Sequence, residues 1–231
     1  MKKENSQGLS NKLPNKTSLV LKNLGPAVFA LATSQPWLAV IFTGAVGFLG
    51  LFGDLAQKRL NELIKAMNQN KDNFAHDSIK SHPNKFRAVF LDVLDKLIRE
   101  TSEEKRKLLK NYLINTFKGI EKDFNYHSRF SWVINNITLD ELKIISNFSE
   151  IPPQQIEKGK TLNIEDFGVG TSHIQQFFRN QGVNFDEDYI ESLLWSLTVY
   201  GFIIAKTGRW NGTFWRGPTY LGKNFLKFIK D

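Results

Sequence analysis

The pattern of apolar and polar positions predicts a chain that is mainly α-helical. From residue 86 to 98, apolar residues recur at intervals of three and four, the spacing of one buried helix face. Similar stripes follow at 108–117, 124–137 and 142–148. The pairs Thr101 with Glu104 and Thr138 with Glu141 have the spacing of a capping box at a helix start. These helices, joined by short connections, predict a small bundle within residues 54–150.

The most apolar part of the chain is residues 24–53. The 31 residues 23–53 carry no charge, and 36–53 is an 18-residue run whose only hydroxyl is Thr43. As a helix with a rise of about 1.5 Å per residue, this run would span roughly 27 Å, close to the hydrocarbon thickness of a bilayer. We therefore expect a transmembrane helix that begins at Pro36, because proline suits a first helical turn. Asp54 then caps an amphipathic helix whose apolar stripe runs from Leu55 to Met67, and the polar residues 68–81 are expected to form a loop.

Small residues on the predicted membrane helix suggest that it associates with another helix. Ala39, Thr43 and Gly47 recur every four residues, a spacing that allows close approach of helix backbones. Together with Pro36 and Gly50, they form the candidate membrane and self-association site.

Two other interpretations of residues 24–53 stay open. The same run could be a buried hairpin of a water-soluble core, or it could be docked on a partner protein. A signal peptide ending near Ala30-Leu31-Ala32 is disfavoured, because the stronger apolar run lies after it. Basic residues flank the run on both sides, so charge does not orient it.

The C-terminal part has a different order of elements. Pro152-Pro153 and the polar residues after them predict a boundary, with a second domain over residues 155–231. Helices are expected at 172–180 and 186–200, followed by a strand at 202–205, a turn at 208–212, a strand at 213–216 and a final helix from Thr219. This order of helix, helix, hairpin and helix resembles a winged-helix domain, which makes the expected module α+β.

A winged-helix-like module can bind either DNA or protein. The candidate nucleic-acid or partner contacts lie on and beside the hairpin: Lys206, Arg209, Trp210, Trp215 and Arg216. The helix at 186–200, however, carries four acidic residues and no lysine or arginine, a composition that repels phosphates. We therefore favour a packing or partner-binding role over DNA binding.

Charge and composition narrow the function further. The net charge of +8 is concentrated at the two ends, +4 in residues 1–22 and +5 in 202–231, around an acidic stretch of −6 at 139–191. Basic ends favour anionic partners such as phospholipid headgroups. The chain has no cysteine, which removes disulfides, thiolate metal sites and cysteine nucleophiles. The four histidines lack ligand spacing, and no hydrolase, kinase or phosphate-loop motif is present, so we expect no enzyme, metal or cofactor.

The overall arrangement resembles bacterial Abi-alpha-like proteins of phage resistance. The likeness rests on the glycine-rich apolar segment, the basic amphipathic run Gln57-Lys58-Arg59-Leu60, the helical body and the motif from Thr219 to Leu226. The resemblance implies an abortive-infection component at the bacterial inner membrane, with its body in the cytoplasm, that answers a protein trigger and self-associates in the phospholipid bilayer. The alternatives are a soluble, cytoplasmic DNA-binding regulator and an adaptor whose apolar segment docks on a protein.

Overall fold

The computed structural model describes residues 39, 41–42, 46–119, 124–151, 155–156, 160–161, 168–207 and 213–230. They form a mainly helical protein with small antiparallel sheets, as the apolar spacing predicted. The chain divides into two compact units, residues 1–131 and 132–231. The boundary predicted after Pro152-Pro153 lies inside the second unit.

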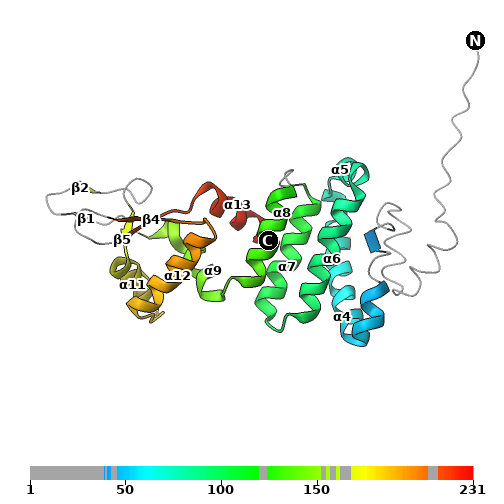
Figure 1. Ribbon diagram of the computed structural model, residues 1–231, viewed down its shortest axis with the longest axis horizontal. Helices are drawn as coiled ribbons and strands as arrows, with labels where there is room; N and C mark the ends of the chain where they lie inside the picture. Colours follow the sequence, from blue (N-terminus) through cyan, green and yellow to red (C-terminus); the bar gives the residue numbers. More distant parts are fainter. Residues whose placement is uncertain are drawn as a thin grey trace, which may run out of the picture. The chain divides into compact units, whose positions relative to one another are not determined.

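The first unit is built on packed helices (Figure 1). α4 (Val46–Asn70) packs on α6 (Pro83–Arg99) and α7 (Glu103–Phe117), and α6 also packs on α7. Between α4 and α6 lie the short elements η2 (Lys71–Asn73) and α5 (His76–Ser81), so the loop predicted for residues 68–81 was wrong. Ile79 explains the difference, because its fully buried side chain anchors α5 in the core.

The helix ends follow local capping chemistry. Thr138 and Glu141 form the predicted capping box at α9 (Leu139–Asn147). At α7 the cap lies one residue later than predicted, because the Ser102 side chain, rather than Thr101, accepts a hydrogen bond from the Lys105 amide. In α4, Gly53 is non-helical, with φ 56° and ψ −136°, so the helix kinks just before Asp54. After this kink Leu55 is 47% exposed, although it was expected on the apolar face.

The predicted membrane segment is only partly described. Residues 39 and 41–42 are helical, and residues 46–53 form the start of α4. Ala39, Ile41 and Phe42 are buried, and the Phe42 ring lies 5.2 Å from that of Phe90 on α6. Among the described helices, none combines the length and apolar character needed to cross a membrane, so the predicted transmembrane helix is unsupported. Within the described residues, the contact of this segment is that of Phe42 with α6, and the choice between a membrane and a buried segment stays a prediction.

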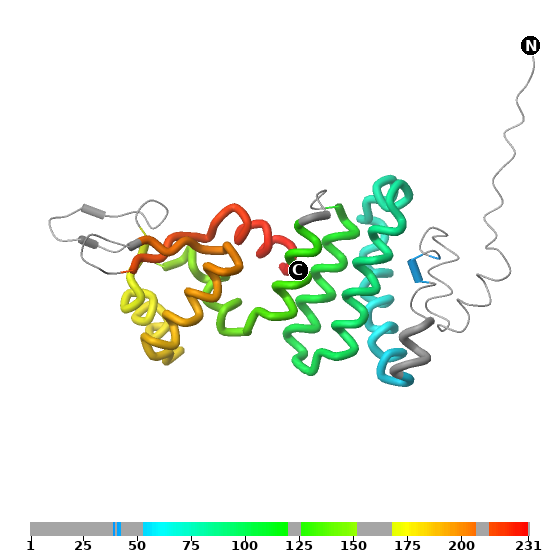
Figure 2. Tube along the Cα trace, viewed as in Figure 1, coloured from blue at the N-terminus to red at the C-terminus, as the bar shows by residue number. Residues whose placement is uncertain are grey.

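The second unit begins in the last turns of α8 (Phe124–Asn136) and continues through α9 and η3 (Phe148–Glu150). A two-stranded ladder pairs β1 (Gln155–Ile156) with β2 (Lys160–Thr161). A three-stranded antiparallel sheet follows, in the order β3-β5-β4, made of β3 (Val169–Gly170), β4 (Ile204–Thr207) and β5 (Thr213–Arg216). Figure 2 shows β4 and β5 running side by side. The predicted hairpin is thus confirmed, and β3 adds a third strand beside β5.

Three helices complete the second unit: α11 (Thr171–Asn180), α12 (Glu187–Val199) and α13 (Tyr220–Ile229). α12 packs on both α11 and α9. Trp215 of β5 is fully buried, and its indole Nε1–H donates to Thr171 Oγ1 at 3.0 Å. Phe202 stacks on Phe225 of α13 with ring centroids 4.5 Å apart. Trp215 therefore joins the sheet to α11, and Phe202 packs the segment before β4 on α13.

Candidate protein-binding surface

The outward face of α12 carries two large exposed apolar side chains. Ile190, Leu193, Leu194 and Leu197 point into the core and are almost fully buried. On the other side, Trp195 is 47% exposed and Val199 is 75% exposed. Residues four apart share a helix face, so these two side chains lie next to each other. We call Asp188, Glu191, Ser192, Trp195 and Val199 the α12 face.

Trp195 is held in place from two sides. Its ring meets the buried Trp215 ring edge-on, with centroids 5.0 Å apart and planes at 82°. Its indole Nε1–H donates to Glu191 Oε1 at 3.3 Å. A large aromatic side chain that is exposed yet fixed loses little conformational entropy on binding, which is why such residues often anchor protein interfaces.

The charge on α12 is acidic. Glu187 and Asp188 are exposed in its first turn, Glu191 follows, and the helix contains no lysine or arginine. Nearby, the Tyr189 hydroxyl donates to Asp140 Oδ2 at 2.8 Å, and this hydrogen bond raises the pKa of Tyr189 above its ordinary value. The phosphates of a nucleic acid would be repelled by this face, whereas a basic protein segment would be attracted.

The hairpin residues predicted to make contacts are divided between two faces of the sheet. Lys206 is exposed and Arg216 is half-buried, and both belong to the outward face. Trp215 points the other way and is 0% exposed, so it supports the core and does not reach a ligand. Arg209 and Trp210 lie outside the described residues.

The predicted self-association residues are also divided. Ala39 is 2% exposed, because it packs within the chain rather than facing outward. Gly47 and Gly50 belong to the first part of α4, and Pro36 and Thr43 lie outside the described residues.

A polar cluster in the first unit was not anticipated from the sequence. Lys96 Nζ donates to Asp92 Oδ2 at 3.0 Å, to Ser131 Oγ at 2.6 Å and to the Ser131 carbonyl at 3.1 Å. Ser131 Oγ donates in turn to Asp92 Oδ2. These hydrogen bonds join α8 to α6.

Nothing in the described part of the chain adds a metal site, since no group of three or more histidine, aspartate or glutamate side chains there could hold an ion.

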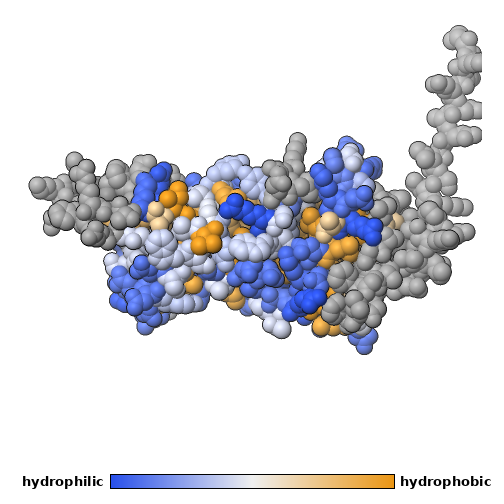
Figure 3. Space-filling model, in the orientation of Figure 1, coloured by the Kyte–Doolittle hydropathy of each residue, from blue (hydrophilic) through white to orange (hydrophobic). Residues whose placement is uncertain are grey.

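On the face shown in Figure 3, hydrophilic residues dominate over α5 to α7, and apolar residues interrupt the surface in several places over the second unit. The sequence places Trp195 and Val199 outside the apolar stripe of this helix, but it does not show that they are exposed in the folded unit.

Comparisons with known proteins found no match: no family model, no curated protein and no solved structure resembles this chain.

Proposed function

We propose that this chain is a non-enzymatic interaction protein whose second unit is a winged-helix-like module that binds a protein partner through the α12 face. The order α9, β3, α11, α12, β4, β5, with the sheet order β3-β5-β4, supports a winged-helix-like assignment. In such a module α12 occupies the place of the recognition helix. The observation that carries the proposal is that Trp195 and Val199 are exposed on a helix that carries acidic residues and contains no lysine or arginine.

The expected partner segment is basic and apolar. Lysine or arginine side chains would complement Asp188 and Glu191, and an apolar side chain would cover Val199. Double-stranded DNA fits this face poorly, because binding DNA requires cations that neutralise phosphates.

Site-specific photocrosslinking of the full chain in its host cell tests the proposal. A benzoylphenylalanine at position 199 should crosslink to a basic segment of one protein, identified by mapping the crosslinked peptide. The same probe at Gln176, an exposed position of α11, should not. Trp195→Ala should weaken the crosslink without unfolding the unit, because the side chain is half-exposed. Equal crosslinking from both positions, or capture of an acidic segment, would remove the proposal.

A gel-shift titration tests the DNA-binding alternative. We expect no saturable shift that depends on Arg209 and Arg216. If changing both residues to alanine abolished a tight shift seen with the intact chain, a DNA-binding regulator would replace the partner-binding proposal.

A second candidate function is a membrane-directed defence effector of the abortive-infection kind. It is favoured by the burial of Ile41 and Phe42 and by the contact of the Phe42 ring with Phe90 of α6, and by the kink at Gly53, where the apolar run ends. On this proposal the first unit stores the apolar segment 24–53, and a trigger bound by the second unit releases it into the inner membrane, where copies associate.

The storage proposal predicts that weakening the contact moves the protein to membranes. Phe90→Ala should increase the membrane fraction, whereas Phe178→Ala, which removes a fully buried phenylalanine from the second unit, should not. Deletion of residues 24–53 should abolish membrane recovery. If the Phe90→Ala protein stayed wholly soluble and monomeric, the storage mechanism would be excluded.

A further inference from the structure

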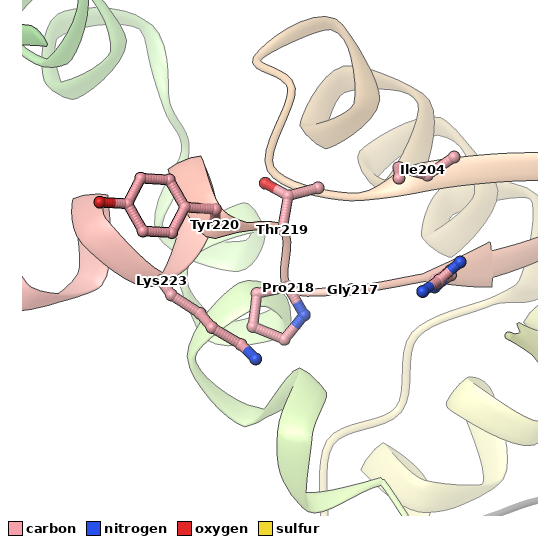
Figure 4. A pocket seen from close by; sticks show the side chains of 7 residues that line it. Ile204, Gly217, Pro218, Thr219, Tyr220 and Lys223 are labelled. Carbon is pink, nitrogen blue, oxygen red and sulfur yellow. The ribbon is translucent and has the colours of Figure 1, made fainter. Parts of the chain in front are cut away.

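A pocket of about 320 Å³ lies where the hairpin meets the start of α13. It is distinct from the α12 face, and Figure 4 shows that its labelled walls come from β4, the β5–α13 connection and the first turn of α13. The described residues of its lining are Ile204, Arg216, Gly217, Pro218, Thr219, Tyr220 and Lys223.

The charged residues among the described lining are both basic. Arg216 enters from β5 and Lys223 from α13, and none of the described lining residues is acidic. The Lys223 side chain reaches back toward Pro218 in Figure 4. Lys227 and Lys230 follow in the sequence, and both belong to the stretch 202–231, whose net charge is +5. The local potential therefore favours an anion.

The pocket walls are held by close packing. A Cβ placed on Gly217 would lie 2.8 Å from Ile203 Cγ2, so the connection already touches the core. Thr219 Oγ1 donates to the Gly201 carbonyl at 2.7 Å and accepts from the Gly222 amide at 3.1 Å. The Gly222 amide is thus used by the Thr219 side chain, and the side chains of Arg216 and Lys223 supply the positive charge of the pocket.

We propose that this pocket binds the phosphate group of a small phosphate ester, with Arg216 and Lys223 as its cationic ligands. A guanidinium and an ammonium from different elements can contact different oxygens of one phosphate. The volume lies at the low end for small-molecule sites and exceeds the size of inorganic phosphate, which leaves space for a few carbon atoms. Ile204, 45% exposed, and Tyr220, 73% exposed, supply apolar surface for that part of the ligand.

Two sources could supply this chemistry: a soluble metabolite and the headgroup of an anionic phospholipid. The test uses isotope-labelled full chain and NMR amide shifts during titration with glycerol 3-phosphate, against sodium chloride of equal ionic strength. Saturable shifts should concentrate at residue 204 and residues 216–223. Arg216→Gln and Lys223→Gln should each weaken binding by about tenfold or more, because a hydrogen bond to a charged group is lost.

The matched control is Lys227→Gln, which removes an exposed charge from the same helix but from outside the pocket lining. It should leave the affinity within about twofold, since exposed charges beyond the site are screened by salt. The indole signal of Trp215, buried and bonded to Thr171, reports whether each variant keeps the folded second unit.

A lipid arm distinguishes the sources. If glycerol 3-phosphate gives no saturable shift, vesicles of phosphatidylcholine with phosphatidylglycerol should bind the chain, vesicles of phosphatidylcholine alone should not, and the Lys223→Gln protein should bind less. Loss of both responses would overturn the proposal. The proposal would also be overturned if Lys227→Gln weakened binding as much as Arg216→Gln or Lys223→Gln. Binding to duplex DNA without any response to glycerol 3-phosphate or to phosphatidylglycerol vesicles would overturn it too.

Discussion

Phe42 and Phe90 offer a direct measurement of whether the apolar segment packs on the first unit in solution. Both side chains are 0% exposed, and their ring centroids are 5.2 Å apart at an interplanar angle of 56°. Removing a buried phenylalanine side chain costs about 3–5 kcal/mol, so Phe42→Ala and Phe90→Ala should each lower the free energy of unfolding by that amount. A detached Phe42 would cost about 0.5 kcal/mol or less.

The double variant Phe42→Ala/Phe90→Ala measures the interaction energy between the two rings separately from the destabilisation that each single change causes. An aromatic pair in this geometry contributes about 0.5–1.5 kcal/mol beyond its buried area, which is the coupling expected between the two changes. Urea unfolding followed by far-ultraviolet circular dichroism gives the four free energies. If the alanine variants are too unstable to measure, Phe42→Leu and Phe90→Leu can replace them, because leucine retains most of the side-chain volume of phenylalanine.

A matched cycle inside the same unit supplies the control. Phe86 and Phe117 lie 5.2 Å apart edge-to-face between α6 and α7 and should show similar coupling. If the Phe86–Phe117 pair couples while Phe42→Ala is neutral and uncoupled to Phe90, the stored position of the segment is wrong, and with it the membrane-effector proposal.

Three further changes test the described core. Gly222→Ala should cost about 1–3 kcal/mol in chemical denaturation, because its Cβ would lie 2.8 Å from the Phe202 carbonyl oxygen; an unchanged midpoint would show that α13 can shift. Ser131→Ala should lower the free energy of unfolding by about 1–2 kcal/mol, since the hydroxyl bonds between α8 and α6 are lost, and a neutral result would mean that these bonds do not form. Tyr112→Phe should cost about 1 kcal/mol at neutral pH by losing the hydroxyl bond to the His127 carbonyl at 2.8 Å. Burial raises the pKa of Tyr112 above its ordinary value of 10.0. The contribution of the tyrosine to the free energy of unfolding is therefore fully present below pH 10.0 and falls as the pH rises beyond it. Raising the pH from neutral to above 10.0 should consequently destabilise the wild type more than Tyr112→Phe.

Local sequence patterns predicted the elements that depend on local physics. The stripe from Phe86 to Ile98 became α6, and the Thr138–Glu141 pair became a capping box, because both signals operate within one or two helical turns. The hairpin was also predicted, since its turn and its flanking strands are adjacent in sequence.

Elements that depend on distant contacts were missed. β3 consists of only Val169 and Gly170, and it is a strand because it pairs with Trp215 and Phe214 far along the chain. α5 is too short to be stable alone and depends on the burial of Ile79.

The candidate site was predicted only in part. The acidic character of the helix at 186–200 was visible in the sequence, but which aromatic residues were exposed was not. Trp215 was expected to contact a ligand and is buried, whereas Trp195 is exposed above it. Only the three-dimensional order of the strands decides which tryptophan lies outside.

The sheet order β3-β5-β4 also limits when the second unit can fold during synthesis. The central strand, β5, is the last of the three to leave the ribosome, so a chain ending at residue 212 would carry β3 and β4 without the strand that joins them. Such a chain would also lack Trp215, which fills the core beneath α12 and bonds to Thr171. The α12 face is therefore completed only after β5 has emerged, and a nascent chain cannot hold Trp195 in its fixed position before then.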